Sequence, residues 1–228
     1  MEDGKKMNNL KILYEDNHII VVIKPYNVPV QADSSNDLDM LTIIKNYIKE
    51  KYNKPGNVYL GLVHRLDKEV GGVMVFAKTS KAASRLSEQV RLHQFEKYYL
   101  AVVKGKVESN TYKDKILREE YQSKIDEKGK EAILSFETLK VIDNNSLVKI
   151  KLLTGRHHQI RVQFKARGHY LLGDKRYGKK GEFPLALYAY HLAFYHPVTK
   201  EKLIFENFPT EGYFQNLDIS SLLTEDKK

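Results

Sequence analysis

Two apolar runs, residues 59–63 and 72–77, enclose the charged tetrad His64-Arg65-Leu66-Asp67. Each run is short and predicts a core strand, so the tetrad is expected where two strands meet. A carboxylate and a guanidinium at the end of a rigid strand are typical of a site that a scaffold holds in place. The alternative is a structural ion pair between Arg65 and Asp67 that caps the strand.

The other expected elements favour an α+β fold with a mixed, mainly antiparallel sheet core and flanking helices, because strands and helices do not alternate regularly. This fold can divide into two half-domains around a central cleft. The sequence predicts two strands within 10–23, further strands over 98–103, 132–141 and 146–153, and two short strands within 192–208. It predicts helices over 39–52, from Thr79 onward and over 154–167. Residues 108–130 are expected to form hairpins or another excursion.

Basic residues are concentrated in one segment of the chain. The formal net charge is +9, and residues 151–180 contain nine lysines and arginines against one acidic residue, Asp174, a local net charge of +8. Such a patch is the electrostatic footprint expected for a polyanion partner. The alternative is a chance cluster in a lysine-rich chain.

Several chemistries are excluded by composition. The absence of cysteine excludes disulfides, thiolate zinc sites and cysteine nucleophiles. The sequence has no phosphate-binding glycine loop, no H-E-x-x-H and no G-x-S-x-G, and its histidines are not spaced with carboxylates as metal ligands. No apolar run approaches the roughly 20 residues of a membrane-spanning helix and no signal core follows Met1, so a cytoplasmic location is expected.

The helix expected over 154–167 would have a cationic side and a core side. The adjacent His157 and His158 would leave it about 100° apart. Basic side chains in its first turn oppose the helix dipole, which makes sense if an anion docks at this end. The cationic face would carry His157, Arg161 and Lys165, and the core face Ile160 and Phe164.

The run 61–79 around the tetrad resembles the HRLD signature of the RluA family of RNA pseudouridine synthases. Further segments resemble motifs of that family in the same order, over residues 10–209. The chain departs from the family at Tyr170, where proline is frequent, and at Val70, where serine or threonine is frequent. No S4-like segment precedes Leu10, so the chain is similar to the shorter members. The matching segments are Val22-Ile23-Lys24-Pro25, Lys97-Tyr98-Tyr99-Leu100-Ala101, Thr154-Gly155-Arg156-His157-His158-Gln159-Ile160-Arg161, Gly168-His169, Leu172-Gly173-Asp174 and His196-Pro197.

The resemblance implies a pseudouridine synthase catalytic domain over 10–212, between an N-terminal tail over 1–9 and a polar C-terminal tail over 213–228. It also implies isomerisation of uridine to pseudouridine in tRNA or ribosomal RNA, without metal or cofactor. Asp67 would act as a nucleophile or as a base at the ribose. Tyr99 would stack on the uracil and assist proton removal at carbon five, although a core tyrosine is the alternative. Arg161 would pair with Asp67 and keep it ionised.

The same resemblance implies base flipping and a stem-loop RNA partner for a monomeric protein. Spacing of two along a strand places Arg65 and Asp67 on one face, so Arg65 is expected to enter the space that the flipped nucleotide leaves. Backbone contacts position RNA without reading its sequence. The expected phosphate contacts are Arg156, Lys165, Lys175 and Arg176, and His64, His158 and Gln159 complete the expected RNA-binding set.

Two other functions compete with the enzyme. A non-catalytic RNA-binding or chaperone module would keep the basic patch and tolerate the loss of Asp67. A metal-independent nuclease would use His157 or His158 as its acid–base pair.

Overall fold

The computed structural model describes residues 10–33 and 37–225, so the tail expected over 1–9 lies outside the described residues. Its contacts divide the chain into two compact units. Unit 1 comprises the described residues up to Phe95 together with Leu192–Asn207. Unit 2 comprises Glu96–His191 and the described residues from Phe208 onward. Both units contain antiparallel strand pairs, and helices flank them, which confirms the expected α+β class.

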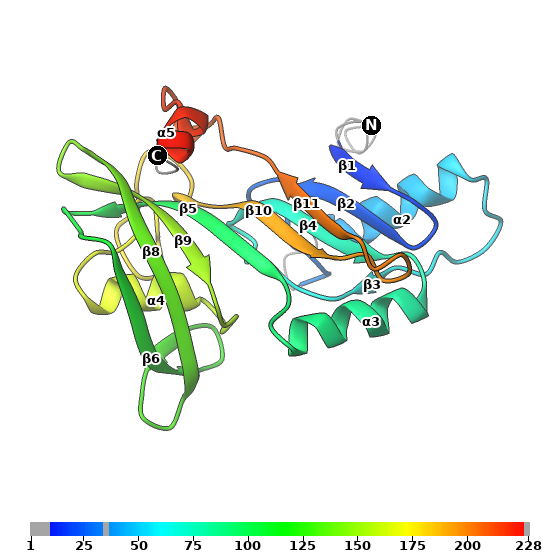
Figure 1. The fold of residues 1–228 in the computed structure, drawn as a ribbon, viewed down its shortest axis with the longest axis horizontal. Helices are drawn as coiled ribbons and strands as arrows, with labels where there is room; N and C mark the ends of the chain where they lie inside the picture. Colours follow the sequence, from blue (N-terminus) through cyan, green and yellow to red (C-terminus); the bar gives the residue numbers. More distant parts are fainter. Residues whose placement is uncertain (1–9, 34–36, 226–228) are drawn as a thin grey trace. The chain divides into compact units, whose positions relative to one another are not determined.

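In its described residues, unit 1 is built on antiparallel strands with the helices α2 and α3 (Figure 1). Strand β4 is buried along its whole length, and α3 packs Ala82 and Leu86 against the core that β4 shares with β2. The elements are β1 (Ile12–Glu15), β2 (Ile19–Lys24), α2 (Met40–Lys51), β3 (Gly61–Leu62), β4 (Gly71–Ala77), α3 (Ser80–Arg91) and β11 (Lys202–Glu206). Strand β2 pairs with β1 and β4, and β4 also pairs with β3. Strand β11 pairs with β10 (Leu187–Tyr195), which starts in unit 2.

Side-chain caps fix where the two helices of unit 1 begin. The side chain of Asp39 accepts a hydrogen bond from the backbone of Thr42, and that of Thr79 accepts one from the backbone of Ala82. Such caps satisfy N–H groups that the first turn of a helix leaves unpaired. The helices expected over 39–52 and from Thr79 onward are therefore confirmed.

Unit 2 carries its strands in the order β10-β5-β9-β8-β6-β7. Helix α4 packs Phe164 against the rings of Tyr112 and Phe136. The excursion expected over 108–130 is a hairpin of β6 and β7, and the expected polar C-terminal tail contains η1 and α5. The elements are β5 (Glu96–Lys104), β6 (Asn110–Arg118), β7 (Ser123–Ile125), β8 (Lys130–Ile142), β9 (Asn145–Leu152), α4 (Gln159–Ala166), η1 (Gly212–Phe214) and α5 (Ile219–Glu225).

The predicted start of the helix expected over 154–167 was wrong, because α4 begins at Gln159. The Oε1 atom of Gln159 accepts hydrogen bonds from the Thr154 hydroxyl and the Arg156 backbone, and His158 takes a left-handed conformation with φ 54°. These features hold residues 154–158 in a loop. The prediction that the two histidines diverge was also wrong, since the rings of His157 and His158 stack with centroids 3.7 Å apart.

Candidate active site

The charged tetrad lies in the loop between β3 and β4 of unit 1. Residues 63–67 form no strand, so the expected strand alternation of Arg65 and Asp67 was wrong. In this loop Arg65 is exposed, Leu66 is buried and Asp67 is half-buried. The backbone N–H of Val70 donates to the Asp67 carbonyl at 3.0 Å and closes a turn behind the carboxylate.

The first residue of the tetrad is bonded to the sheet. The backbone N–H of Val75, in β4, donates to Nε2 of His64 at 3.1 Å. The His64 ring also meets Phe95 edge to face, with centroids 5.8 Å apart. A nitrogen that accepts from a backbone N–H carries no hydrogen of its own. His64 thus fastens the tetrad to the core of unit 1.

A buried lysine supports the other end of the loop. The ammonium of Lys24, at the end of β2, donates to the carbonyls of Pro25 at 2.8 Å and Lys68 at 2.9 Å. Burial lowers the pKa of Lys24 to about 7, although the negative charges of Asp67 and Glu69 act to raise it. The Lys24 side chain is therefore bonded to the turn that follows Asp67.

Tyr99 lies on β5 in unit 2, where it pairs with Ile150 of β9 and is 7% exposed. Two residues earlier, burial lowers the pKa of the Lys97 ammonium. A side chain on Gly155 would reach within 3.6 Å of that ammonium nitrogen. Lys97 therefore lies beside the loop that precedes α4, a placement that the sequence alone did not reveal.

Arg161 projects from α4 and is almost fully buried in unit 2. Its Nε and Nη2 atoms donate to the two oxygens of Asp174, each at 2.8 Å, and its guanidinium carbon lies 5.2 Å from the centre of the Tyr177 ring. Burial acts to raise the pKa of Asp174, but the Arg161 guanidinium and the backbone N–H groups of Tyr177 and Arg176 hold it below its usual range.

Sequence reasoning missed the role of Asp174. It is the one acidic residue in the basic segment 151–180, which was the signal that could have identified it. The predicted pairing of Arg161 with Asp67 stays a prediction.

A hydrogen-bonded chain of side chains lines the loop before α4. The hydroxyl of Ser123 and Nδ1 of His157 lie 2.9 Å apart, and Nδ1 of His158 lies 2.8 Å from the Tyr177 hydroxyl. The backbone N–H of Ser123 donates to the same hydroxyl at 2.7 Å. These bonds join the β6–β7 hairpin to the residues around Arg161.

The predicted RNA-binding residues differ in exposure. The Gln159 side chain is buried, and Nε of Arg156 donates to the Glu131 carbonyl at 2.7 Å. His158 and Arg156 are half-buried, and the fully exposed members are Arg65, Lys165, Lys175 and Arg176.

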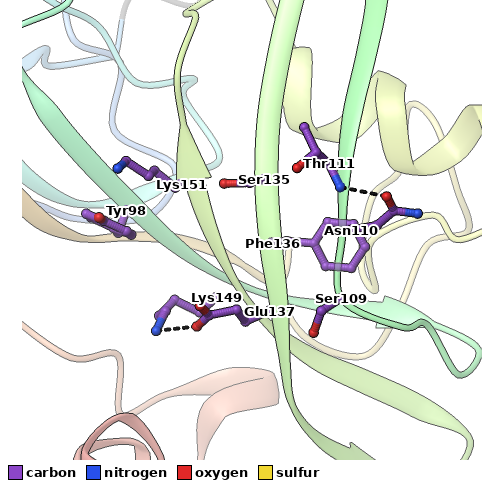
Figure 2. Close-up of a pocket in the computed structure, with 9 residues that line it drawn as sticks. All are labelled: Tyr98, Ser109, Asn110, Thr111, Ser135, Phe136, Glu137, Lys149 and Lys151. Atoms are coloured by element: carbon purple, nitrogen blue, oxygen red, sulfur yellow. Dashed lines mark hydrogen bonds and ion pairs between the residues drawn. The ribbon is translucent and has the colours of Figure 1, made fainter. Parts of the chain in front are cut away.

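A groove of about 620 Å³ lies on the sheet of unit 2, and neither Tyr99 nor Arg161 is among its lining residues (Figure 2). Lys149 pairs with Glu137 there, and the ammonium of Lys151 lies 5.8 Å from the centre of the Tyr98 ring. The groove is lined by Tyr98, Ser109, Asn110, Thr111, Ser135, Phe136, Glu137, Lys149 and Lys151.

Within residues 10–33 and 37–225, no cluster of three or more histidine, aspartate or glutamate side chains is arranged to hold a metal ion. In the same part of the chain, no helix is both long and apolar enough to cross a membrane.

Comparison with known sequences identifies a family model described as RNA pseudouridylate synthase, which matches residues 18–166. The chain is 37% identical over 217 residues to an uncharacterized RNA pseudouridine synthase of Aquifex aeolicus, covering 86% of this chain and 68% of that protein. It is 33% identical over 216 residues to ribosomal large subunit pseudouridine synthase D of Zymomonas mobilis, with the same coverage of 86% and 68%.

Two solved structures have a similar fold. Human RNA pseudouridylate synthase domain containing 1 superposes with a TM-score of 0.74 at 25% identity, covering 98% of both chains. Human RNA pseudouridylate synthase domain containing 4 superposes with a TM-score of 0.75 at 22% identity, covering 90% of both chains. The segment that the family model matches includes Asp67, Tyr99 and Arg161.

Proposed function

Because the chain belongs to the RNA pseudouridylate synthase family, we propose that this enzyme isomerises specific uridines in stem-loops of tRNA or ribosomal RNA, with Asp67 as its catalytic carboxylate. The observation that carries the proposal is the fixed loop around Asp67. His64 bonds this loop to β4, and Lys24 supports the turn behind it. A carboxylate on a rigid support suits a reaction that depends on precise placement.

The reaction breaks the bond between ribose C1′ and uracil N1 and forms a bond between C1′ and C5. The C5 hydrogen is lost and N1 gains one, so no oxidant or reductant takes part. Asp67 acts either as a nucleophile at the ribose or as a base that removes a ribose proton, since carboxylates serve both roles in glycosyl chemistry. The target nucleotide is flipped out of its stack, and Arg65 occupies the space that it leaves.

Tyr99 stacks on the detached uracil and assists removal of the C5 proton, while Arg161 keeps Asp67 ionised and oriented. A guanidinium has five N–H donors in a rigid fork. Asp174 accepts from two of these donors, on Nε and Nη2 of Arg161. A guanidinium can therefore bind a second carboxylate together with Asp174.

RNA is held mainly through its phosphates. The exposed side chains of Lys165, Lys175 and Arg176, with Arg156 at the loop before α4, are the proposed phosphate contacts. Such contacts release counterions, so affinity should fall steeply with salt. The remaining members of the set, His64, His158 and Gln159, each have a side-chain hydrogen bond within the protein, and we assign them a supporting role.

The test uses bulk tRNA and ribosomal RNA labelled with tritium at uridine C5. We expect the wild-type protein to release tritium and leave RNA length unchanged, and Asp67→Asn to release none. The matched control is Glu69→Gln, which removes a carboxylate two residues away and should retain release. Equal release by Asp67→Asn, or none by wild type on any RNA class, would overturn the proposal.

A further inference from the structure

The β6–β7 hairpin of unit 2 ends in an exposed aromatic ring. Tyr121 lies in the turn between the two strands and is 69% exposed, the largest value among the exposed large hydrophobic residues of the described chain. A single exposed aromatic side chain is common on protein surfaces. What distinguishes Tyr121 is the way its turn is fixed.

Three hydrogen bonds tie this turn to residues of the candidate active site in unit 2. The Arg176 guanidinium donates to the Tyr121 carbonyl. The Ser123 backbone donates to the Tyr177 hydroxyl, and the Ser123 hydroxyl bonds to His157. The Ser123 side chain is buried, so its two bonds are partly shielded from water, whereas the bond from Arg176 lies at the exposed surface.

The same bonds connect the hairpin to Arg161. Tyr177 lies under the Arg161 guanidinium, and its backbone N–H donates to Asp174, the ion-pair partner of Arg161. The turn that carries Tyr121 is thus held in place relative to a proposed catalytic residue, and the Tyr121 ring extends from it into solvent.

The turn itself carries little net charge, and basic side chains of the neighbouring segment supply the attraction for a polyanion. Glu119 and Lys124 pair with each other at 2.7 Å, and the exposed Glu120 beside Tyr121 offsets Arg118. Exposed Arg118 lies beside the turn in sequence, and exposed Lys175 precedes the arginine that binds the turn. Proteins that bind unpaired RNA combine basic side chains for the backbone with aromatic rings on which bases stack.

We propose that Tyr121 stacks on an unpaired base in the RNA loop that carries the target uridine, which makes the hairpin a substrate-recognition element. This inference rests on the proposed function, because it takes an RNA stem-loop as the substrate. It adds a contact to a base, whereas the lysines and arginines of the basic segment contact phosphates.

The test measures binding in an Asp67→Asn background, in which RNA binds without turnover. The probe is the stem-loop that this protein selects from a library with a randomised loop. Adding Tyr121→Ala should weaken binding about tenfold, within the range measured for loss of one stacked base. Adding Tyr121→Phe keeps the ring and should stay within about twofold. With 2-aminopurine placed in turn at each loop position, fluorescence should rise at one position in Tyr121→Ala.

The matched control is Val141→Ala, which trims another exposed apolar side chain of unit 2 and should leave affinity unchanged. Melting curves and circular dichroism will establish that Tyr121→Ala is folded. Unchanged affinity in folded Tyr121→Ala, an equal loss in Tyr121→Phe, or a library that yields no bound RNA would overturn the stacking proposal.

Tritium release by wild-type protein is scored separately, so the two proposals can fail independently. Release with no effect of Tyr121→Ala on binding would overturn only the role of the hairpin. A Tyr121-dependent affinity without release on any RNA would overturn the proposed function and support the stacking.

Discussion

The buried guanidinium of Arg161 and the buried carboxylate of Asp174 meet at two points, Nε to Oδ2 and Nη2 to Oδ1, each at 2.8 Å. Backbone N–H groups of Arg176 and Tyr177 also donate to Asp174. Two charges taken out of water are costly, and only good geometry with further hydrogen bonds offsets that cost. The pair therefore orients Arg161 rigidly, which is what the proposed chemistry requires of it.

Removing the carboxylate should be strongly destabilising. In Asp174→Asn the buried Arg161 guanidinium loses its bidentate carboxylate partner, and we expect a loss of about 3–5 kcal/mol in the free energy of unfolding, measured with urea. The double variant Arg161→Met with Asp174→Asn should regain part of that stability, because neither charge is left buried and the amide oxygen can still accept from the backbone N–H groups of Arg176 and Tyr177. It should remain inactive in the tritium assay. Recovery of activity would show that Arg161 acts only through its packing.

Lys24 should make stability depend on pH in the alkaline range. Its pKa is about 7 in the folded protein and near 10.5 when unfolded, so the unfolded chain binds more protons between these values. Stability should therefore rise with pH, by about 2 kcal/mol from pH 7 to pH 9. The free energy of unfolding, measured with denaturant from pH 7 to pH 9, should rise with pH in the wild-type protein. The rise should be absent in Lys24→Met. A flat wild-type profile would contradict the burial of a titrating Lys24.

Local sequence signals predicted the framework well. Asp39 and Thr79 begin helices because their side chains cap the residues that follow, and a polar turn separates β1 from β2. The tetrad was placed correctly between two strands that pair with each other, although it lies in the loop itself.

Long-range partners could not be predicted in the same way. The bond from Val75 to His64 crosses 11 residues, and Arg161 finds Asp174 13 residues away, beyond the reach of helical spacing. The helix was predicted to start too early because the apolar periodicity of Ile160 and Phe164, which belongs to α4, was extended back to Thr154 and Gly155. The hydrogen bonds that the Gln159 side chain accepts from Thr154 and Arg156, which hold the preceding residues outside the helix, give no periodic signal in the sequence.

His64 should affect turnover more than RNA affinity. His64→Ala removes the acceptor of the Val75 N–H and frees the loop that carries Asp67. Since small displacements of a reacting group are costly, we expect kcat to fall about tenfold to a hundredfold, with a change in RNA Kd below about threefold. The matched control is His93→Ala, which removes an exposed imidazole from the same unit. A large loss of affinity with normal kcat would instead support a direct contact of His64 with RNA.

Glu15 should make unit 1 sensitive to acid. Burial acts to raise its pKa, but hydrogen bonds from Lys51, Lys78, Tyr52 and Tyr47 lower it to about 2. Because this pKa lies below the ordinary value of 4.5, the stabilisation is complete above pH 4.5 and is lost as pH falls toward 2. Wild type should exceed Glu15→Gln by at most about 3 kcal/mol at pH 6, and the difference should vanish near pH 2. The exposed Glu50→Gln is the control, and an equal acid dependence in all three proteins would exclude this role for Glu15.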